Sequence, residues 1–417
     1  MVTSVHIVGA GMAGLAAATR LSAAGVDVTL HEAANQAGGR CRSYHDQTID
    51  MLIDNGNHLV LSGNGSVLAY LADVGATDRL VGPAHAEFPF VDLATNERWT
   101  LRPNDGVLPW WIFDSSRRVP GTRAANYLAM ARLLWHGKHK TIGETIDCNG
   151  TLYRRLMRPV LLAALNTEPR EGSAALAAAV IRETLATGGR ACRPLVARDG
   201  LGLAFVEPAL QLLARRNAKV QFGHRLRAFN GESNRVTALQ FGDETIALGP
   251  NDAVILAVPP MVASAIVPGL QTPDEFRAIV NAHFRIEPPK GLAPITGSVN
   301  SMVEWLFAFP DRLSVTISAA DRLLDTSREE LAEQIWREVC AIARIDSALP
   351  RWQIVRERRA TFAATPAQDA KRPKPETAYR NLWLAGDWTA TGLPATIESA
   401  IRSGHKAAQL AGDSTAH

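Results

Sequence analysis

The order of elements at the start of the chain constrains its fold more than any other feature. Residues 5–8 (VHIV) are a strand-like run, and they lead directly into Gly9, Gly11 and Gly14 of a GxGxxG motif. A helical pattern rich in Ala and Leu follows, and then a second strand-like run at residues 26–30. This order predicts a βαβ nucleotide-binding unit, in which the glycines let the backbone approach a pyrophosphate at the start of the helix.

Two further features near this motif indicate which dinucleotide it binds. Glu32 closes the second strand about 20 residues after the glycines, where it would accept hydrogen bonds from a ribose. Gly38, Gly39 and Arg40 then repeat the glycine device and add a guanidinium suited to phosphate. A second anion-binding loop so close to the first favours FAD over NAD, with one ligand contacted twice.

The C-terminal region returns to the same kind of unit. A strand-like run at residues 382–385 leads into Gly386 and Asp387, and a helical pattern starts near Thr396 and Ile397. Backbone N–H groups at that helix start would stabilise negative charge on a flavin ring or a phosphate, and Asp387 would accept a hydrogen bond from a ribityl hydroxyl. Gly-Asp is also common turn chemistry, so a plain turn stays open here.

The predicted fold class is α/β, with a Rossmann-like FAD-binding domain and a mixed α+β substrate domain, both discontinuous. Strands at 218–229 and 252–260, with a helix at 205–216 before the first, would complete the cofactor domain, and an adenine edge would bond the backbone near Leu226. Residues 274–308 and a helix at 328–345 would complete the substrate domain. We assign residues 1–62, 196–262 and 370–417 to the FAD-binding domain, and residues 63–195 and 263–369 to the substrate domain.

These motifs resemble the FAD-dependent amine oxidase and phytoene desaturase superfamily. Three stretches are similar to one branch of it, the hydroxysqualene dehydroxylases, also called squalene-associated FAD-dependent desaturases: residues 54–58 (DNGNH), 200–208 (GLGLAFVEP) and 386–400 (GDWTATGLPATIESA). The resemblance implies reductive removal of the hydroxyl of hydroxysqualene to give squalene for hopanoid synthesis, with hydride from reduced FAD. The branch usually has Gln where this chain has Asn57, so the amide has a shorter reach here.

The DNGNH stretch supplies the candidate catalytic residues. Cleavage of an allylic C–O bond requires a group that protonates or hydrogen-bonds the departing hydroxyl, and His58 is the best candidate because the pKa of a histidine lies near neutrality. A turn-capping histidine would explain the same residue. Asn57 and Asp54 are further candidates, although both also suit a role in shaping the loop.

The middle of the chain supplies candidates for an apolar substrate tunnel. An uncharged isoprenoid must be bound through buried apolar area, and Trp110, Trp111, Phe113 and Trp388 are the aromatic residues expected to line the tunnel. Residues 127–135 and 154–165 carry apolar residues at helical spacing, for which tunnel lining and ordinary core packing both remain open. Basic residues at 136–140 follow the first helix, so it could instead seat the protein on an anionic membrane surface.

Composition excludes several other classes. The net charge of +3, without long runs of like charge, argues against nucleic acid as a partner, and the four scattered cysteines indicate reduced thiols and no metal site. No signal peptide or spanning segment is expected, which favours a cytoplasmic location, with room for peripheral contact on the inner face of the cytoplasmic membrane. Association with squalene-synthesis enzymes is a further expectation.

Three rival functions remain open at this stage. An isoprenoid or carotenoid desaturase would share the fold, FAD and tunnel but move hydride in the opposite direction. An amine oxidase would need a lysine near the flavin and an aromatic cage. A non-catalytic scaffold for squalene-synthesis partners would have no need of the glycine and acid devices, which argues against it.

Overall fold

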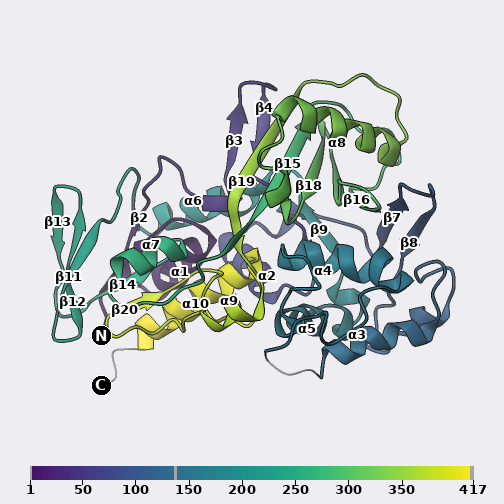
Figure 1. Ribbon diagram of the computed structural model, residues 1–417. Coiled ribbons are helices and arrows are strands. Elements are labelled where there is room, and N and C mark those ends of the chain that lie inside the picture. Colours follow the sequence, from purple (N-terminus) through teal and green to yellow (C-terminus); the bar gives the residue numbers. More distant parts are fainter. Residues whose placement is uncertain (1, 136–138, 414–417) are drawn as a thin grey trace.

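The computed structural model describes residues 2–135 and 139–413 (Figure 1). A parallel sheet with its helices lies near both chain ends, a larger mixed sheet lies at the opposite end, and a helical region lies beside the larger sheet. The basic segment predicted at residues 136–140 falls partly outside the described residues. Helices packed on a parallel sheet confirm the predicted α/β class.

The parallel sheet is assembled from distant parts of the chain. β1 (Ser4–Val8) lies at its centre and pairs with β2 (Asp27–His31) and β14 (Asp252–Leu256). β10 (Lys219–Gln221) extends the sheet beyond β2, and β20 (Leu382–Leu384) extends it beyond β14. The strands predicted around residues 5, 26, 252 and 382 therefore meet in one sheet.

Two helices from opposite ends of the chain pack closely beside this sheet. α1 (Met12–Ala23) and α10 (Ile397–Asp413) approach so closely that a Cβ on Gly404 would lie 2.1 Å from the backbone oxygen of Ala13. α6 (Glu207–Arg215) and α2 (Gly65–Val74) join the same hydrophobic core. α2 therefore packs beside the parallel sheet, although the sequence-based boundary of the predicted cofactor domain lies at residue 62.

A small antiparallel sheet follows β10. It consists of β11 (Ala228–Glu232), β12 (Arg235–Phe241) and β13 (Glu244–Ala247). The single strand predicted at residues 218–229 is therefore wrong, since β10 and β11 belong to different sheets. Gly223, with a φ of +67°, lies in the segment that separates them.

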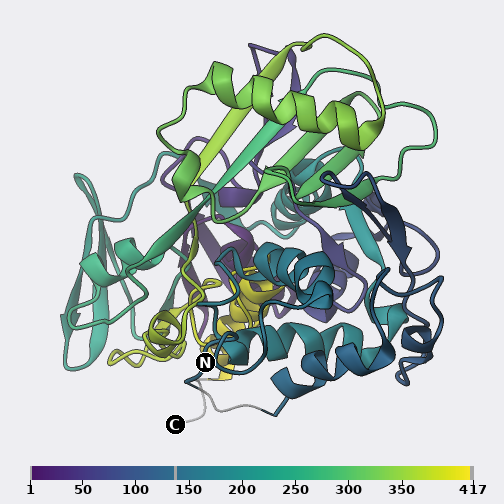
Figure 2. The same cartoon turned by 45° about the vertical axis from the view of Figure 1, so that its right-hand side comes forward.

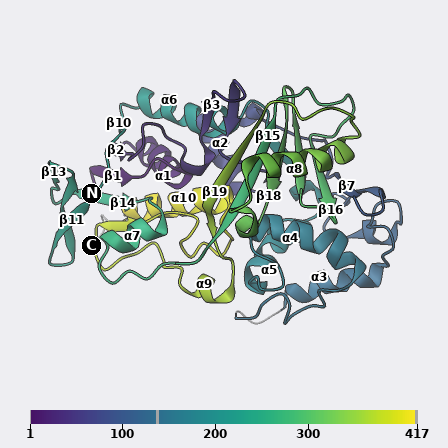
Figure 3. The ribbon, with the colours of Figure 1, turned by 45° about the horizontal axis from the view of Figure 1, so that its top comes forward.

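The larger sheet forms the other half of the molecule, with strand order β19-β15-β18-β17-β16-β7-β8. Its strands are β7 (Phe88–Asp92), β8 (Arg98–Leu101), β15 (Phe276–Phe284), β16 (Ile295–Val299), β17 (Trp305–Phe309), β18 (Arg312–Ile317) and β19 (Trp352–Phe362). α8 (Arg328–Ala343) packs through its apolar residues against one face (Figure 3).

The two faces of this sheet differ because side chains alternate along each strand. On β15, Val280 and Ala282 point toward α8 and join its core, whereas Ile279 and Asn281 line a cavity on the opposite face. On β18, Thr316 also faces the cavity. One face of the sheet thus makes core, and the other makes a binding wall.

The helical region completes the cavity side. It contains α3 (Leu128–Leu133), α4 (Arg158–Leu165) and α5 (Ala174–Glu183), which come forward in Figure 2. The remaining short elements are β3 (Ser43–Asp46), β4 (Met51–Asp54), β5 (Val60–Leu61), β6 (Leu80–Val81), β9 (Pro194–Ala197), α7 (Pro260–Ile266) and α9 (Pro366–Ala370). Within the described residues, no helix has the length and apolar character needed to cross a bilayer.

Candidate active site

A cavity of about 830 Å³ is lined by residues of both sheets and of the helical region. Its lining includes Gly9 and Glu32 from the parallel sheet side, Asn281 and Thr316 from the larger sheet, and Leu161 from α4. It therefore joins a polar, glycine-rich end to an end walled mainly by apolar side chains.

The first glycine loop is shaped by backbone contacts. Gly9 has a φ of +104°, and a Cβ there would lie 2.4 Å from the backbone oxygen of Ala257. A Cβ on Gly14 would lie 1.9 Å from the backbone oxygen of Gly9, whereas a Cβ on Gly11 would meet nothing within 4 Å. Gly14 is thus required by packing, and Gly11 borders open cavity at the start of α1, where a phosphate would lie.

The second glycine loop packs directly on the first. The Gly38 N–H donates to the backbone oxygen of Ala10 at 2.8 Å, and Gly38 and Gly39 have φ values of +106° and +54°. A Cβ on Gly39 would lie 3.3 Å from the Cα of Gly11. The predicted repeat of the glycine device is therefore one continuous backbone surface on the cavity.

Glu32 ties this surface together. Its carboxylate accepts hydrogen bonds from the backbone N–H groups of Ala10 and Ala34, each at 2.8 Å. It also lines the cavity at the end of β2. Since a carboxylate has about four acceptor sites, Glu32 retains capacity for the ribose hydroxyl predicted from the sequence.

Arg40 and Asp387 make a contact that the sequence does not predict. They were expected to bind phosphate and a ribityl hydroxyl separately, but the Arg40 guanidinium donates to the Asp387 carboxylate at 2.7 Å and also to the backbone oxygen of Ala360. Both side chains line the cavity. The pair joins the N-terminal loop to the C-terminal unit, so it fixes the two halves of the polar end relative to each other.

The C-terminal turn is also built for close contact. A Cβ on Gly386 would lie 2.4 Å from Nε1 of Trp388, whose indole N–H donates to the backbone oxygen of Val258 at 2.9 Å. Thr396 caps α10 by accepting from the Ser399 N–H at 3.1 Å. The cavity is lined here by Gly386, Trp388, Thr396 and Ile397, and Leu226 also lines it. Every predicted cofactor residue except Gly14 therefore lines the cavity.

The polar end fits FAD on these observations. The open space at Gly11, the N-termini of α1 and α10, and the carboxylate of Glu32 provide backbone and side-chain groups for an extended dinucleotide. Arg40 and Asp387 would lie beside it. These are the residues that would hold the cofactor.

The three candidate catalytic residues separate in the structure. Asp54 does not line the cavity; it accepts from the Ser43 hydroxyl at 2.5 Å and from the Leu201 N–H at 2.9 Å, and burial raises its pKa. Asn57 and His58 both line the cavity. Asp54 therefore anchors the loop to the turn at residue 200, which favours its alternative role in shaping the loop.

His58 differs from the acid that the sequence suggested. Enclosure by protein, followed by the positive charge of Arg40, lowers its pKa to about 4, although Asp387 acts in the opposite direction. The imidazole is therefore neutral near pH 7. It can exchange hydrogen bonds with a ligand in the cavity, but an imidazolium acid is not its resting form.

The predicted tunnel residues need correction. Trp110 and Phe113 are 66% and 65% exposed, and Trp111 is buried against Tyr127; these three do not line the cavity, whereas Trp388 does. The apolar wall comes instead from residues including Phe88, Phe90, Leu101, Met130, Leu156, Met157, Val160, Leu161, Ala164, Trp305 and Phe307. Within the segment 154–165, residues 156, 157, 160, 161, 163 and 164 line the cavity, whereas Leu165 packs in the core, so the segment combines its two predicted roles.

Sequence reasoning also missed polar residues that line the cavity, among them Asn166, Asn281 and Thr316. The available signal was weak: Asn281 interrupts an apolar strand pattern at a position that alternation places on one face.

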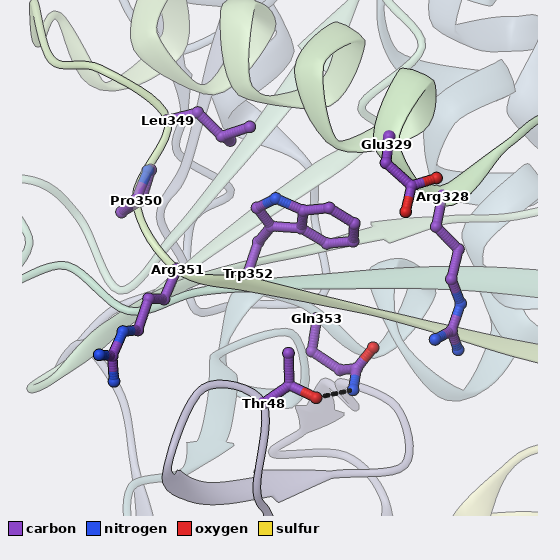
Figure 4. A pocket seen from close by; sticks show the side chains of 8 residues that line it. All are labelled: Thr48, Arg328, Glu329, Leu349, Pro350, Arg351, Trp352 and Gln353. Atoms are coloured by element: carbon purple, nitrogen blue, oxygen red, sulfur yellow. Dashed lines mark hydrogen bonds between the residues drawn. The ribbon is translucent and has the colours of Figure 1, made fainter.

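A separate hollow of about 550 Å³ lies between residue 48, the start of α8 and the start of β19, with Trp352 and Arg328 at its walls (Figure 4). None of its described lining residues also lines the main cavity.

Comparison with known proteins gives concordant matches. Residues 12–411 match the family described as flavin containing amine oxidoreductase. Hydroxysqualene dehydroxylase of Rhodopseudomonas palustris is 60% identical over 411 residues, with 98% of each chain covered, and hydroxysqualene dehydroxylase of Zymomonas mobilis is 46% identical over 406 residues, with 97% of this chain and 98% of that protein covered. The solved structure of cyclohexylamine oxidase from Brevibacterium oxydans has a TM-score of 0.72 at 15% identity, with 99% of both chains covered, a likeness of fold alone.

Proposed function

The chain belongs to the flavin containing amine oxidoreductase family, and from this premise we propose that it removes the hydroxyl of hydroxysqualene reductively to give squalene. Its cofactor is FAD, and it is an oxidoreductase. The observation that carries the proposal is the 60% identity, over nearly the full length of both chains, with a hydroxysqualene dehydroxylase. The product suits squalene and hopanoid biosynthesis.

The shape of the cavity supports this function. Its polar end accommodates a dinucleotide, and it continues without interruption into a wall of aliphatic and aromatic side chains from α4 and the larger sheet. A squalene skeleton offers no charge, so its affinity must come from buried apolar area, at about 25 cal/mol per Å². A long apolar end joined to the flavin end meets that requirement.

In the proposed reaction, a C–O bond at the allylic carbon is replaced by a C–H bond. When bound in its reduced form, FAD supplies the hydride, and with it both electrons, that replaces the hydroxyl on the allylic carbon. The C–O bond breaks, and the oxygen leaves with an added proton as water. The chain holds the hydrocarbon against the polar end, excludes bulk water, and presents the neutral His58 as a hydrogen-bonding group in the cavity.

An anaerobic single-turnover experiment tests the proposal. FAD-loaded protein, reduced with dithionite and freed of excess reductant, is mixed with hydroxysqualene, and flavin reoxidation is followed together with squalene by mass spectrometry. We expect both signals to rise with the same rate constant and in equal amounts. Absence of both would refute the proposed reaction.

The rival activities predict different results in matched assays. An isoprenoid desaturase would reduce oxidised flavin when given a saturated segment, and it would not turn hydroxysqualene into squalene. An amine oxidase was expected to have a lysine near the flavin, and the described cavity lining contains no lysine. The intact glycine cradle and carboxylate argue against a pure scaffold.

We further propose peripheral contact with an anionic membrane through the exposed apolar residues of the segment 107–135, which we call the apolar surface: Val107, Leu108, Trp110, Phe113, Leu128 and Trp135. These side chains are 57 to 83% exposed. The surrounding sequence, residues 102–140, carries seven Lys or Arg residues against two Asp residues, which complements anionic lipid. Leu128 belongs to α3, and Met130 of that helix lines the cavity, so we expect the substrate to enter beside this surface. Association with squalene-synthesis enzymes stays a prediction.

A further inference from the structure

Two buried amide side chains, those of Asn57 and Asn281, line the cavity. Asn281 lies in the middle of β15 and is 1% exposed, and Asn57 follows β4 and is also buried. Both line the cavity. Thr316, which is paired with Asn281 across β15 and β18, completes the group.

Backbone groups fix the orientation of both amides. The Asn57 N–H can only donate, and it donates to Oδ1 of Asn281 at 3.3 Å, so the other end of the Asn281 amide must be its NH₂ group. The backbone oxygen of Val315 can only accept, and it accepts from Nδ2 of Asn57 at 3.2 Å. Thr316 accepts from Nδ2 of Asn57 and donates to Oδ1 of Asn281 at 2.8 Å. The network therefore leaves no freedom to flip either side chain.

This network leaves two complementary groups unused. Nδ2 of Asn281 has no hydrogen-bond partner among the described residues, and Oδ1 of Asn57 is buried without one. A Cβ on Gly56 would lie 3.0 Å from Nδ2 of Asn281, so the glycine leaves that N–H group room. An unsatisfied buried polar group costs about 1–3 kcal/mol, which a ligand with the missing donor and acceptor would recover.

The side-chain amide of Asn166, in the same cavity, shows that amide N–H and oxygen atoms can all be paired within the protein. Asn166 donates from Nδ2 to the backbone oxygen of Arg277 and to Thr361, and its Oδ1 accepts from the Ala319 N–H at 2.7 Å. All of its amide groups are therefore used within the protein. Asn281 differs from Asn166 in having an amide N–H group without a hydrogen-bond partner among the described residues.

We propose that Asn281 is the residue that binds the substrate hydroxyl, with its Nδ2–H donating to the hydroxyl oxygen. A hydroxyl both accepts and donates hydrogen bonds, and the unpaired acceptor of Asn57 lies in the same network. This assignment rests on the proposed function. Because an amide N–H does not titrate in this range, Asn281 holds and polarises the departing oxygen, while the proton that completes water comes from another group.

The decisive variant is Asn281→Asp, which keeps an acceptor for Asn57 and Thr316 but removes the donor. Binding of hydroxysqualene and of squalene to the oxidised, FAD-loaded protein is measured through the flavin spectrum at pH 8. We expect hydroxysqualene to bind about 10- to 100-fold more weakly than to the wild type, as for the loss of one buried hydrogen bond, and squalene to change by less than about 2-fold. Asn166→Asp is the matched control, and it should leave the ratio of the two affinities unchanged.

Lowering the pH adds a readout that a merely structural role would not give. Burial raises the pKa of an introduced carboxyl, so in Asn281→Asp the protonated form should restore a donor. Hydroxysqualene affinity should then recover between pH 8 and pH 5.5, with squalene affinity unaffected. Equal weakening of both ligands, or wild-type affinity for hydroxysqualene at pH 8, would overturn the assignment. Failure of the proposed function is distinguishable, because then the wild-type protein itself would not convert hydroxysqualene.

Discussion

The two ends of the cavity differ in the atoms that line them, which are mainly backbone atoms at one end and side-chain atoms at the other. At the cofactor end the surface is largely backbone: Gly11, Gly38 and Gly39 bring main chain to the cavity, and two helices begin there. At the substrate end the surface is side chain, contributed by α4, β15, β17 and β18. The first end is therefore specified by where side chains are absent, and the second by which side chains are present.

This difference predicts how the ends respond to substitution. A backbone surface tolerates almost no added atom, because main chain cannot move aside as a flexible side chain can. An apolar wall tolerates exchange among hydrophobic residues of similar volume, at a cost usually below about 1.5 kcal/mol. The predictions that follow test this contrast.

The largest effect is expected at Gly14. The added Cβ of Gly14→Ala would lie 1.9 Å from the backbone oxygen of Gly9, so α1 would have to separate from its loop. We expect loss of the folded, FAD-loaded protein, measured by thermal unfolding and flavin absorbance. A soluble protein with wild-type flavin content would contradict the packing argument.

Gly11→Ala is the matched comparison at the same loop. Its Cβ would meet no protein atom within 4 Å, and its φ of −75° suits alanine. The unfolding temperature without FAD should therefore stay the same or rise slightly, whereas FAD affinity should fall sharply because the methyl group occupies the expected phosphate position. Unchanged FAD affinity would place the pyrophosphate elsewhere.

A block at the substrate end should leave the cofactor end intact. Ala164 of α4 lines the apolar wall, and Ala164→Trp would fill the space that the hydrocarbon needs. We expect kcat/KM for hydroxysqualene to fall by about 100-fold or more, with the flavin spectrum and FAD affinity unchanged. Ala214→Trp, at an exposed position of α6, is the control, and equal activity of the two variants would show that the substrate lies elsewhere.

The same contrast explains what the sequence could reveal. Gly9, Gly11, Glu32 and Gly386 could be predicted because a dinucleotide-binding loop places glycines and an acidic residue at a fixed spacing in the sequence, and all four line the cavity. The tunnel residues Trp110 and Phe113 were wrongly predicted, since an apolar run reads the same whether it lines a cavity, fills a core or lies exposed. Hydrogen bonds and ion pairs between residues that lie far apart in the sequence could not be predicted from the sequence pattern.

Asn281 and Arg40 show this last limit most clearly. The partner of Asn281 is separated from it by 224 residues, and the Arg40–Asp387 pair spans 347 residues. Neither contact leaves a local signal, because each depends on how β15 or the C-terminal turn is placed in space. The sequence shows which chemical groups these residues carry, but only the folded structure shows which residues they contact.

An intermediate effect is expected at the apolar surface beside α3. Replacing Trp110 and Phe113 by Ser should weaken binding to vesicles containing anionic phosphatidylglycerol by about tenfold, because both side chains are exposed and would enter the lipid interface. Sedimentation with vesicles measures this. Phe222→Ser removes an exposed aromatic outside this surface and should have no effect; equal loss in both variants, or binding that ignores lipid charge, would argue against this surface as the contact.

The smallest effect concerns His58, which stands where the two ends meet. Its folded pKa of about 4 lies below the ordinary value of 6.5, so below pH 6.5 the unfolded chain binds a proton that the folded protein refuses. His58 should therefore contribute stability that is complete above pH 6.5 and is lost as the pH falls toward 4, at no more than about 1.4 kcal/mol per pH unit.

His58→Gln removes this titration, so the free energy of unfolding should fall less between pH 7 and pH 5 in the variant than in the wild type, as measured by denaturant titration. The wild-type protein, titrated in the same way, is the reference for this slope. If His58→Gln also kept that slope, His58 would protonate in the folded protein as readily as in the unfolded chain. An imidazolium would then be available in the cavity near neutral pH, and His58 would return as the proton donor to the departing oxygen held by Asn281.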